Sequence, residues 1–233
     1  MFLYLFCCFS YYLTYSLLSS HPLQNVLYPD TSSIVTKEYR IVNTVKAVTL
    51  GVISPACTFI LYHALSPYHE PNLHLMYFFG ATYASLDMSA LIYNPNCHTS
   101  TIVHHVLVQF LYYYCYYHHY NMDTLVKGIT VYAIFSCYAY LVNYRLAIRF
   151  MKHKHENLIN NLSLAIYFIC CGFNWSIQLY LILFEMKQTY LIEKLVYTGL
   201  IGMIMNDDIF LIKFLLNSYP NRKVPNSNNN EKI

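Results

Sequence analysis

Long apolar stretches alternate with short polar ones over most of the chain. Seven apolar segments stand out, at about 1–19, 41–65, 73–93, 101–120, 125–150, 158–184 and 195–217. Most are close to the roughly 20 residues that a helix needs to cross a bilayer. The breaks between them hold Pro, His, Asn and charged residues, as in SPYHEPN, NPNCHTS and KHKHEN. This pattern predicts an all-α protein, a polytopic transmembrane bundle of seven helices.

The same pattern divides the chain into three parts. Residues 1–20 are predicted to form an N-terminal transmembrane helix, residues 36–217 a six-helix membrane domain, and residues 218–233 a disordered polar tail rich in Asn. The first part, MFLYLFCCFSYYLTYSLLSS, could instead be a cleaved signal peptide. It lacks a basic first region and a small-x-small cleavage site, so a retained helix is favoured.

Composition agrees with a membrane protein and argues against several other classes. Hydrophobic residues make up 57% of the chain and charged residues 11%, whereas soluble domains average about 25% charged residues. The net charge of +3 is small, and no run alternates Lys with aromatic residues, so nucleic acid is not a predicted partner. The eight Cys form no CxxC pair and indicate reduced thiols rather than a disulfide framework.

The orientation follows from Lys and Arg, which gather on one side if the seven segments alternate in direction. Of the 14 basic residues, eleven fall on that side. They are Lys37, Arg40, Lys46, Arg145, Arg149, Lys152, Lys154, Lys213, Arg222, Lys223 and Lys232. The other side has Lys127, Lys187 and Lys194. Because short cytosolic loops carry the excess of Lys and Arg, the N-terminus is predicted to be lumenal and the C-terminus cytosolic.

Several polar side chains fall at similar depths in the cytosolic half of the predicted bundle. An ionisable group in hydrocarbon costs about 2.5–3.5 kcal/mol on insertion scales, so such groups are expected to face one another. We therefore predict an inward-facing polar cluster that opens, if anywhere, toward the cytosol. Its candidate members are Lys46, Asp87, His104, His105, Asn143, Arg145, Asn206, Asp207 and Asp208.

The simplest role for such a cluster is to hold the helices together. Hydrogen bonds between transmembrane helices contribute about 0.6 kcal/mol each on average. In this interpretation Asp87 pairs with His105, and Arg145 pairs with Asp207 or Asp208. A transporter is a weaker alternative, because no pair of helices broken by Gly or Pro is evident.

Two chemical roles are also open. A histidine beside a carboxylate can act as a general base or nucleophile, so His104 or His105 with Asp87 could catalyse acyl transfer from acyl-CoA. Metal catalysis is not predicted, because the HxxxH and HxxHH boxes of membrane di-iron enzymes are absent. Of the other histidines, His118 and His119 are predicted at the opposite membrane face, and His153 and His155 in a basic loop. No cofactor is predicted; acyl-CoA would be a co-substrate under the acyl-transfer hypothesis alone.

A non-catalytic alternative is lipid binding or sensing by a helical barrel. Its polar base would hold a head group and its aromatic walls an acyl chain. The run LYYYCYYHHY could line such a space, although an interfacial aromatic belt explains it as well. Membrane lipids would then be the partners, and a homo- or hetero-oligomer in the membrane is possible.

The order of several motifs resembles the TLC-domain family, over roughly residues 37–217. KEYRIVNTVKAVTLGV resembles the family's charged and aromatic entry into its first core helix, and GATYASLDMSALI the helix with the family Asp, which would be Asp87. STIVHHV resembles the paired-His motif, YLVNYRLAIRF the Asn-x-Arg motif at Asn143 and Arg145, and MIMNDDIFLIKF the last helix.

The chain also departs from this family in specific places. Lys46 stands where relatives often have His, Ser136 and Tyr140 replace a Glu and a Pro, and Asn174 replaces an Arg. The His-Asp motif that ceramide synthases carry after the paired His has no match here. The resemblance is therefore closer to the small TLC-domain proteins, which implies lipid homeostasis in endomembranes such as the endoplasmic reticulum. An acyl-CoA-dependent N-acyltransferase of the ceramide synthase type is the alternative.

Overall fold

Helices are the only regular secondary structure in the part of the chain that the structure describes. This computed structural model describes residues 1–20, 34–65, 72–95, 97–121, 124–149, 155–186 and 190–218. The helices are α1 Phe2–Ser20, α3 Ile34–Leu65, α4 Leu73–Tyr93, α5 Thr99–Tyr117, α6 Thr124–Tyr138, α7 Tyr140–Ala147, α8 Glu156–Tyr180, the π-helical turn η1 Leu181–Glu185, and α9 Leu191–Asn217. The predicted all-α class is confirmed. The predicted disordered tail lies, apart from Ser218, outside the described residues.

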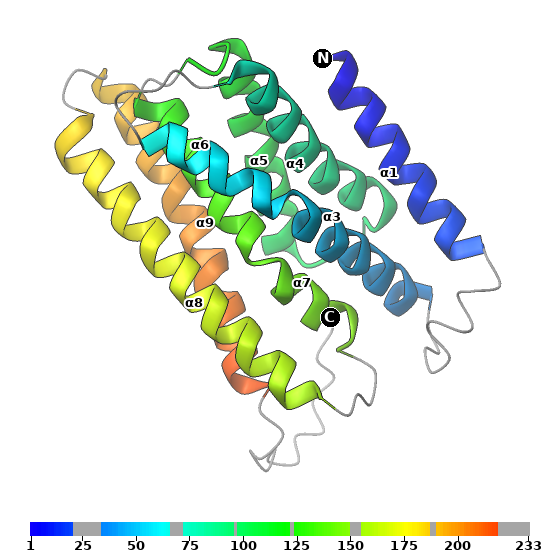
Figure 1. The fold of residues 1–233 in the computed structure, drawn as a ribbon. Helices are drawn as coiled ribbons and strands as arrows, with labels where there is room; N and C mark the ends of the chain where they lie inside the picture. Colours follow the sequence, from blue (N-terminus) through cyan, green and yellow to red (C-terminus); the bar gives the residue numbers. More distant parts are fainter. Residues whose placement is uncertain are drawn as a thin grey trace.

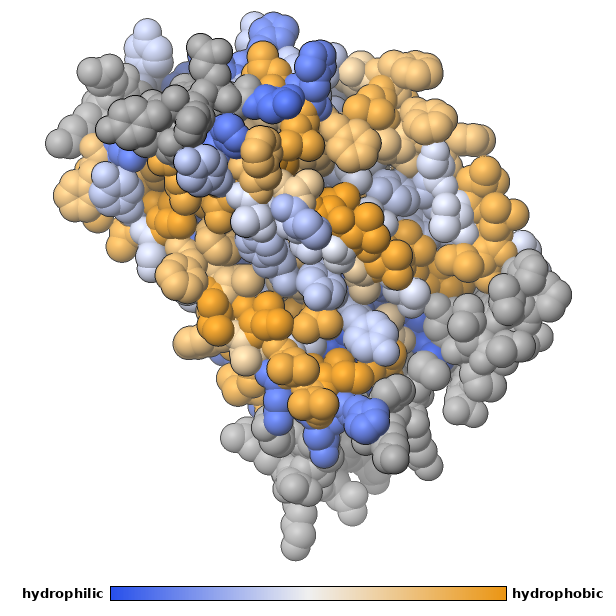
Figure 2. Space-filling view, in the orientation of Figure 1, coloured by the Kyte–Doolittle hydropathy of each residue, from blue (hydrophilic) through white to orange (hydrophobic). Residues whose placement is uncertain are grey.

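Several of these helices are suited to a membrane. By length and composition, four spans could cross one: Phe2–Ser20, Lys37–Leu65, Leu73–Tyr93 and Glu156–Glu185. The bent pair of α6 and α7 would make a fifth if it forms one span. Figure 2 shows hydrophilic residues toward two ends of one face, with hydrophobic and weakly polar residues between them. The chain is therefore suited to be an integral membrane protein, and the count of seven spans stays a prediction.

The helices other than α1 follow one another around a ring. Each contacts the next in the order α3, α4, α5, α9, α8, and then α6 with α7, which return to α3. α1 stands outside the ring at one edge of the bundle, against α4 and α3, while α8 and α9 form the opposite edge (Figure 1). The polar side chains that face inward from the ring are therefore separated from lipid by a wall of helices.

The predicted segment 125–150 is broken between α6 and α7. The two helices meet at Ala139 and their axes differ by 45°. No Pro or Gly lies at this point. Four residues apart within α6, the Ser136 hydroxyl donates to the Tyr132 carbonyl oxygen at 3.1 Å, a type of bond that often bends helices. The bend directs α7 along α3 and α8.

α5 begins and ends with specific local structure. At its start, the Ser100 backbone N–H donates to His98 Nδ1 at 3.2 Å, which satisfies one of the free N–H groups of the first turn. After its end, His119 and Tyr120 adopt left-handed backbone conformations, with φ of 52° and 51°. The predicted segment 101–120 therefore stops being helical at Tyr117.

α1 lies on a face of α4 that is made of small residues. Ala81, Ser85 and Ser89 are spaced four apart and are all buried. The small side chains let the two backbones approach closely, as is common between helices in membranes. The Ser89 hydroxyl donates to the Cys8 carbonyl oxygen of α1 at 3.1 Å. α1 thus contacts the bundle through fitted packing and a helix-to-helix hydrogen bond.

Candidate functional site

Three ionisable side chains from consecutive helices of the ring meet in the interior. The Lys46 ammonium of α3 donates to Asp87 Oδ1 of α4 at 2.5 Å. Lys46 Nζ also lies 3.3 Å from Nε2 of His105 on α5, and His105 Nδ1 lies 3.2 Å from Asp87 Oδ1. All three residues are buried. The predicted pairing of Asp87 with His105 is confirmed, and Lys46 completes it as the positive partner.

A second histidine–carboxylate pair lies next to the first. His104 Nδ1 is 3.3 Å from Asp207 Oδ2 of α9, and the two imidazole rings are T-shaped with centroids 5.7 Å apart. The side chains of His104 and Asp207 keep 18% and 23% of their surface exposed, twice the exposure of His105 and Asp87 or more. This pair is therefore the more accessible part of the group. We call Lys46, Asp87, His104, His105 and Asp207 the polar cluster.

The polar cluster also has the residue types of a metal site. Ligand atoms of Asp87, His104 and His105 all lie within 4.8 Å of one another, and in the described part of the chain they form the one such group. However, the Lys46 ammonium already contacts Asp87 and His105. A metal ion bound there would lie beside this cation, and like charges repel strongly where the dielectric constant is low. The geometry fits an internally paired cluster better than a metal centre.

Asp208, the residue after Asp207, points into a different network. Its carboxylate accepts hydrogen bonds from the hydroxyls of Tyr132 at 2.6 Å and Tyr167 at 2.7 Å, and from the Trp175 indole N–H at 3.3 Å. Three neutral donors on α6 and α8 therefore satisfy a buried acid of α9. These donors were not predicted, because the many tyrosines of this sequence give no signal that singles out Tyr132 or Tyr167.

Arg145 does not contact the acids of α9, so the predicted pairing with Asp207 or Asp208 is wrong. Its Nε donates to Asn160 Oδ1 at 3.1 Å and its Nη2 to Glu156 Oε1 at 2.9 Å. Asn160 in turn donates to the Leu215 carbonyl oxygen at 3.2 Å. Arg145 thus fastens α7 to the first turns of α8 and, through Asn160, to α9.

Two other predicted members lie away from the polar cluster. Asn206 is exposed on the outside of α9, and Asn143 is partly exposed on α7. Two residues that were not proposed for the interior, Asn174 and Gln178, are buried on α8. Gln178 donates to the Gly128 carbonyl oxygen at 2.9 Å and accepts from the Tyr197 hydroxyl. Their spacing of four on one helix is the signal that could have placed them on a common inward face.

An apolar cavity lies about one helical turn from the polar cluster. It lies among α4, α5, α6 and α9, and its volume is about 40 Å³. That is room for about three water molecules. Its walls are mostly aliphatic and aromatic. Three of its lining residues are each three positions from a cluster member on the same helix: Ala84, Val108 and Ile204.

The cavity therefore starts about one helical turn from the charged groups, since three residues rise about 4.5 Å along a helix. All three lining residues are displaced in the same direction, away from the end where α4 stops and α5 begins. The site as a whole is charged at one end and apolar at the other. No family model, curated protein or solved structure matches this chain. The resemblance to the TLC-domain family stays a prediction.

Proposed function

We propose that this chain is an integral membrane protein that binds membrane lipids and thereby senses or regulates them. The observation that supports this most is that the apolar cavity begins about one helical turn from the polar cluster. Ligand sites are generally apolar clefts with a few convergent polar groups that fix orientation. A lipid has the matching distribution of polar and apolar groups, with a polar head group for the cluster and a hydrocarbon chain for the cavity.

The position of the site inside the ring supports the same proposal. A ligand there would be shielded from bulk lipid by the surrounding helices, so that binding could be selective. The resemblance of the motifs around Asp87 and His105 to TLC-domain proteins implies the same role, in the endoplasmic reticulum. The excess of Lys and Arg on one side supports a lumenal N-terminus and a cytosolic C-terminus.

The direct test is to identify the lipids that remain bound after purification. The full chain would be purified in mild detergent, and bound lipids would be compared by mass spectrometry with the lipids of the source membrane. We expect one lipid class to be enriched. In the double variant Lys46→Gln/Asp87→Asn the enrichment should fall by about ten- to a hundredfold, the equivalent of the 1.5–3 kcal/mol typical of a charge-assisted hydrogen bond.

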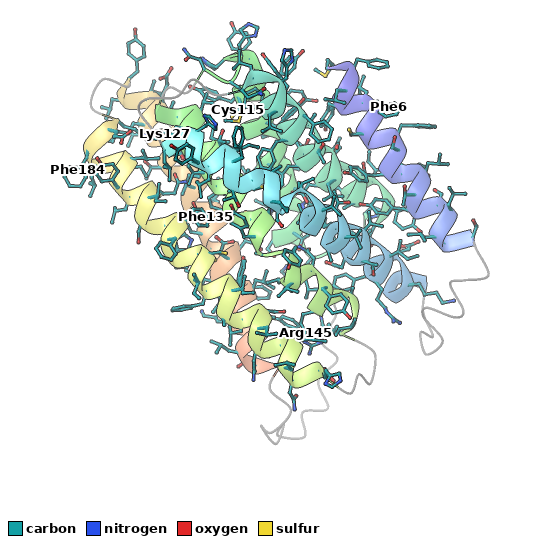
Figure 3. The ribbon with its side chains drawn as sticks, viewed as in Figure 1. Phe6, Cys115, Lys127, Phe135, Arg145 and Phe184 are labelled. Atoms are coloured by element: carbon teal, nitrogen blue, oxygen red, sulfur yellow. The ribbon has the colours of Figure 1, made fainter. Side chains whose placement is uncertain are left out.

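A matched control is available at the other end of the bundle. Lys127 pairs with Glu185 at 3.1 Å, and Lys127 and Arg145 lie toward opposite ends of the molecule (Figure 3). Lys127→Gln removes a charge from a partly exposed ion pair without touching the cavity. It should leave the bound lipids unchanged. A folded wild type that carries no lipid class above its membrane abundance would refute the proposal.

Acyl transfer is the second candidate, favoured by the two histidine–carboxylate pairs. The amine nitrogen would attack the thioester carbonyl of acyl-CoA while one imidazole takes the proton of the amine. The imidazole would then pass that proton to the sulfur of CoA, which leaves as the thiol. His104 is the better candidate because its side chain is more exposed than that of His105. Cells without ceramide synthases, given labelled acyl-CoA, should form ceramide with the wild type but not with His104→Ala. If the folded wild type forms none, acyl transfer is excluded.

A further inference from the structure

Tyr120 closes the apolar cavity at the end away from the polar cluster. The residue follows α5 in a turn in which the Tyr120 N–H donates to the Cys115 carbonyl oxygen at 2.9 Å and the Asn121 N–H to the His118 carbonyl oxygen at 2.9 Å. His119 and Tyr120 both have φ near 50°. Helix ends of this type usually carry Gly or Asn at the left-handed position. A bulky residue there is an outlier, so the backbone is strained where it turns this side chain inward.

The ring of Tyr120 fills a place that the opposite helix leaves open. Tyr120 is 3% exposed and lines the cavity, and its ring meets that of Tyr77 edge to face at 5.0 Å. On α4, a Cβ added to Gly80 would lie 1.7 Å from the Tyr120 hydroxyl oxygen. Gly80 is therefore required for the ring to occupy this position. Sequence and backbone are both arranged around one inward-facing tyrosine.

The hydroxyl group of Tyr120 does not explain this arrangement. Among the described residues, its hydroxyl is buried without a hydrogen bond, which is unfavourable for a polar group. A Phe or Leu side chain would fill the same space without this cost. The ring does have a defined place relative to the polar cluster. Gly80 precedes Asp87 by seven residues, a rise of about 10 Å along α4.

We propose that Tyr120 is a stop that limits the length of the hydrocarbon chain held in the cavity. This inference rests on the proposed lipid-binding function and adds the class of ligand, a lipid with a short or medium alkyl chain in this site. With C–C bonds of about 1.5 Å, an extended chain advances about 1.25 Å per carbon. A chain whose head group lies at the polar cluster would reach the Tyr120 ring after about eight carbons. Because the cavity has room for about three water molecules, side chains of its walls must move aside to admit a chain of that length.

The test compares chain-length profiles of wild type and Tyr120 variants. Saturated fatty acids from octanoic to stearic acid would be titrated against a fluorescent fatty acid bound to the purified full chain. Tyr120→Gly suits the left-handed backbone and removes the ring, so the variant is expected to fold. Each further buried methylene strengthens binding by about fourfold. Affinity for the longest acids should therefore rise about tenfold or more in Tyr120→Gly, while that for octanoic acid stays within about twofold.

Two further variants separate the ring from the hydroxyl and check the geometry. Tyr120→Phe keeps the ring and should keep the wild-type profile, because the stop is steric. Gly80→Ala should destabilise the wild type, and the same change should be tolerated in Tyr120→Gly, because the clashing ring is gone. If Tyr120→Phe shifts the profile as Tyr120→Gly does, a steric stop is refuted.

The remaining outcomes distinguish this inference from the function on which it rests. If wild type and Tyr120→Gly bind the same acids with the same affinities, Tyr120 is not a stop and lipid binding stands. If neither protein binds any fatty acid although both are folded, and no lipid co-purifies, lipid binding fails and this inference fails with it.

Discussion

Lys46 makes the polar cluster a buried ion pair. Its ammonium is held by Asp87 and lies against His105, so that a positive and a negative charge are buried together. Breaking such a pair from one side leaves the other charge buried alone, which typically costs about 3–5 kcal/mol. Removing both charges can be close to neutral. The cluster is therefore predicted to tolerate paired changes and not single ones.

The single variants Lys46→Gln and Asp87→Asn should each destabilise the protein by about 3–5 kcal/mol, because each leaves an uncompensated buried charge. The double variant Lys46→Gln/Asp87→Asn should recover most of this loss. Unfolding in mixed micelles would measure the free energies and close the double-mutant cycle. Lys127→Gln, at a partly exposed pair, should cost about 1 kcal/mol or less. Equal losses for the single and double variants would contradict a coupled pair.

Five of the nine candidate residues lie in the polar cluster, and the sequence could not decide which way the others point. Asn206, Asp207 and Asp208 are consecutive, and each step along a helix turns the side chain by about 100°. Three in a row cannot all face inward. The structure directs Asp207 to His104 and Asp208 to the two tyrosines, and leaves Asn206 exposed. Position along the helix was predictable from the pattern, whereas rotation depends on how α9 packs.

At the scale of elements, the sequence predicted where helices lie better than where they end. The segment predicted from residue 41 begins as a helix at Ile34, and the one predicted to residue 120 ends at Tyr117. Apolar runs mark the part of a helix in hydrocarbon and not its polar ends. The break between α6 and α7 was not predicted, because no Pro or Gly marks it in the sequence.

α7 has eight residues and depends on its neighbours for stability, since isolated helices of that length are marginal in water. Arg145 provides two of its connections to α8. Arg145→Lys should loosen α7, because an ammonium cannot reproduce the forked geometry that contacts Asn160 and Glu156 at once. A loss of about 1.5–3 kcal/mol is expected, as for hydrogen bonds to charged groups.

Hydrogen exchange of the α7 amides would detect this loosening locally. Exchange should accelerate over Tyr140–Ala147 and change little in α4. Lys127→Arg, on α6, is the control for an exchange between Lys and Arg. It keeps the positive charge that pairs with Glu185. Unchanged protection of α7 in Arg145→Lys would show that the contacts to α8 do not hold it.

At the scale of the molecule, the orientation in the membrane is the prediction that most needs a measurement. Cys97 lies between α4 and α5, outside the helices and partly exposed. It therefore reports the side on which that end of the bundle lies. Burial raises the pKa of the Cys97 thiol above its ordinary value, an effect that nearby Lys46 partly offsets.

In sealed microsomes that carry the chain with Cys7→Ser and Cys8→Ser, a membrane-impermeant maleimide added outside should label Cys97, because that face is predicted to be cytosolic. Only the thiolate reacts, so the raised pKa predicts labelling at neutral pH that is slower than for an ordinary thiol and that accelerates as the pH rises. Cys97→Ser gives the background. Labelling that requires detergent would place this end of the bundle in the lumen and reverse the predicted orientation.

The seam between α1 and α4 bears on how the protein associates with others in the membrane. Ala81, Ser85 and Ser89 form a row of small residues on α4, the kind of surface by which transmembrane helices dimerise. In this chain α1 occupies that surface. α1 therefore takes the place on α4 that a helix of a second subunit would need. Whether the first helix is kept or removed during maturation would then decide whether this face is closed or free for oligomerisation.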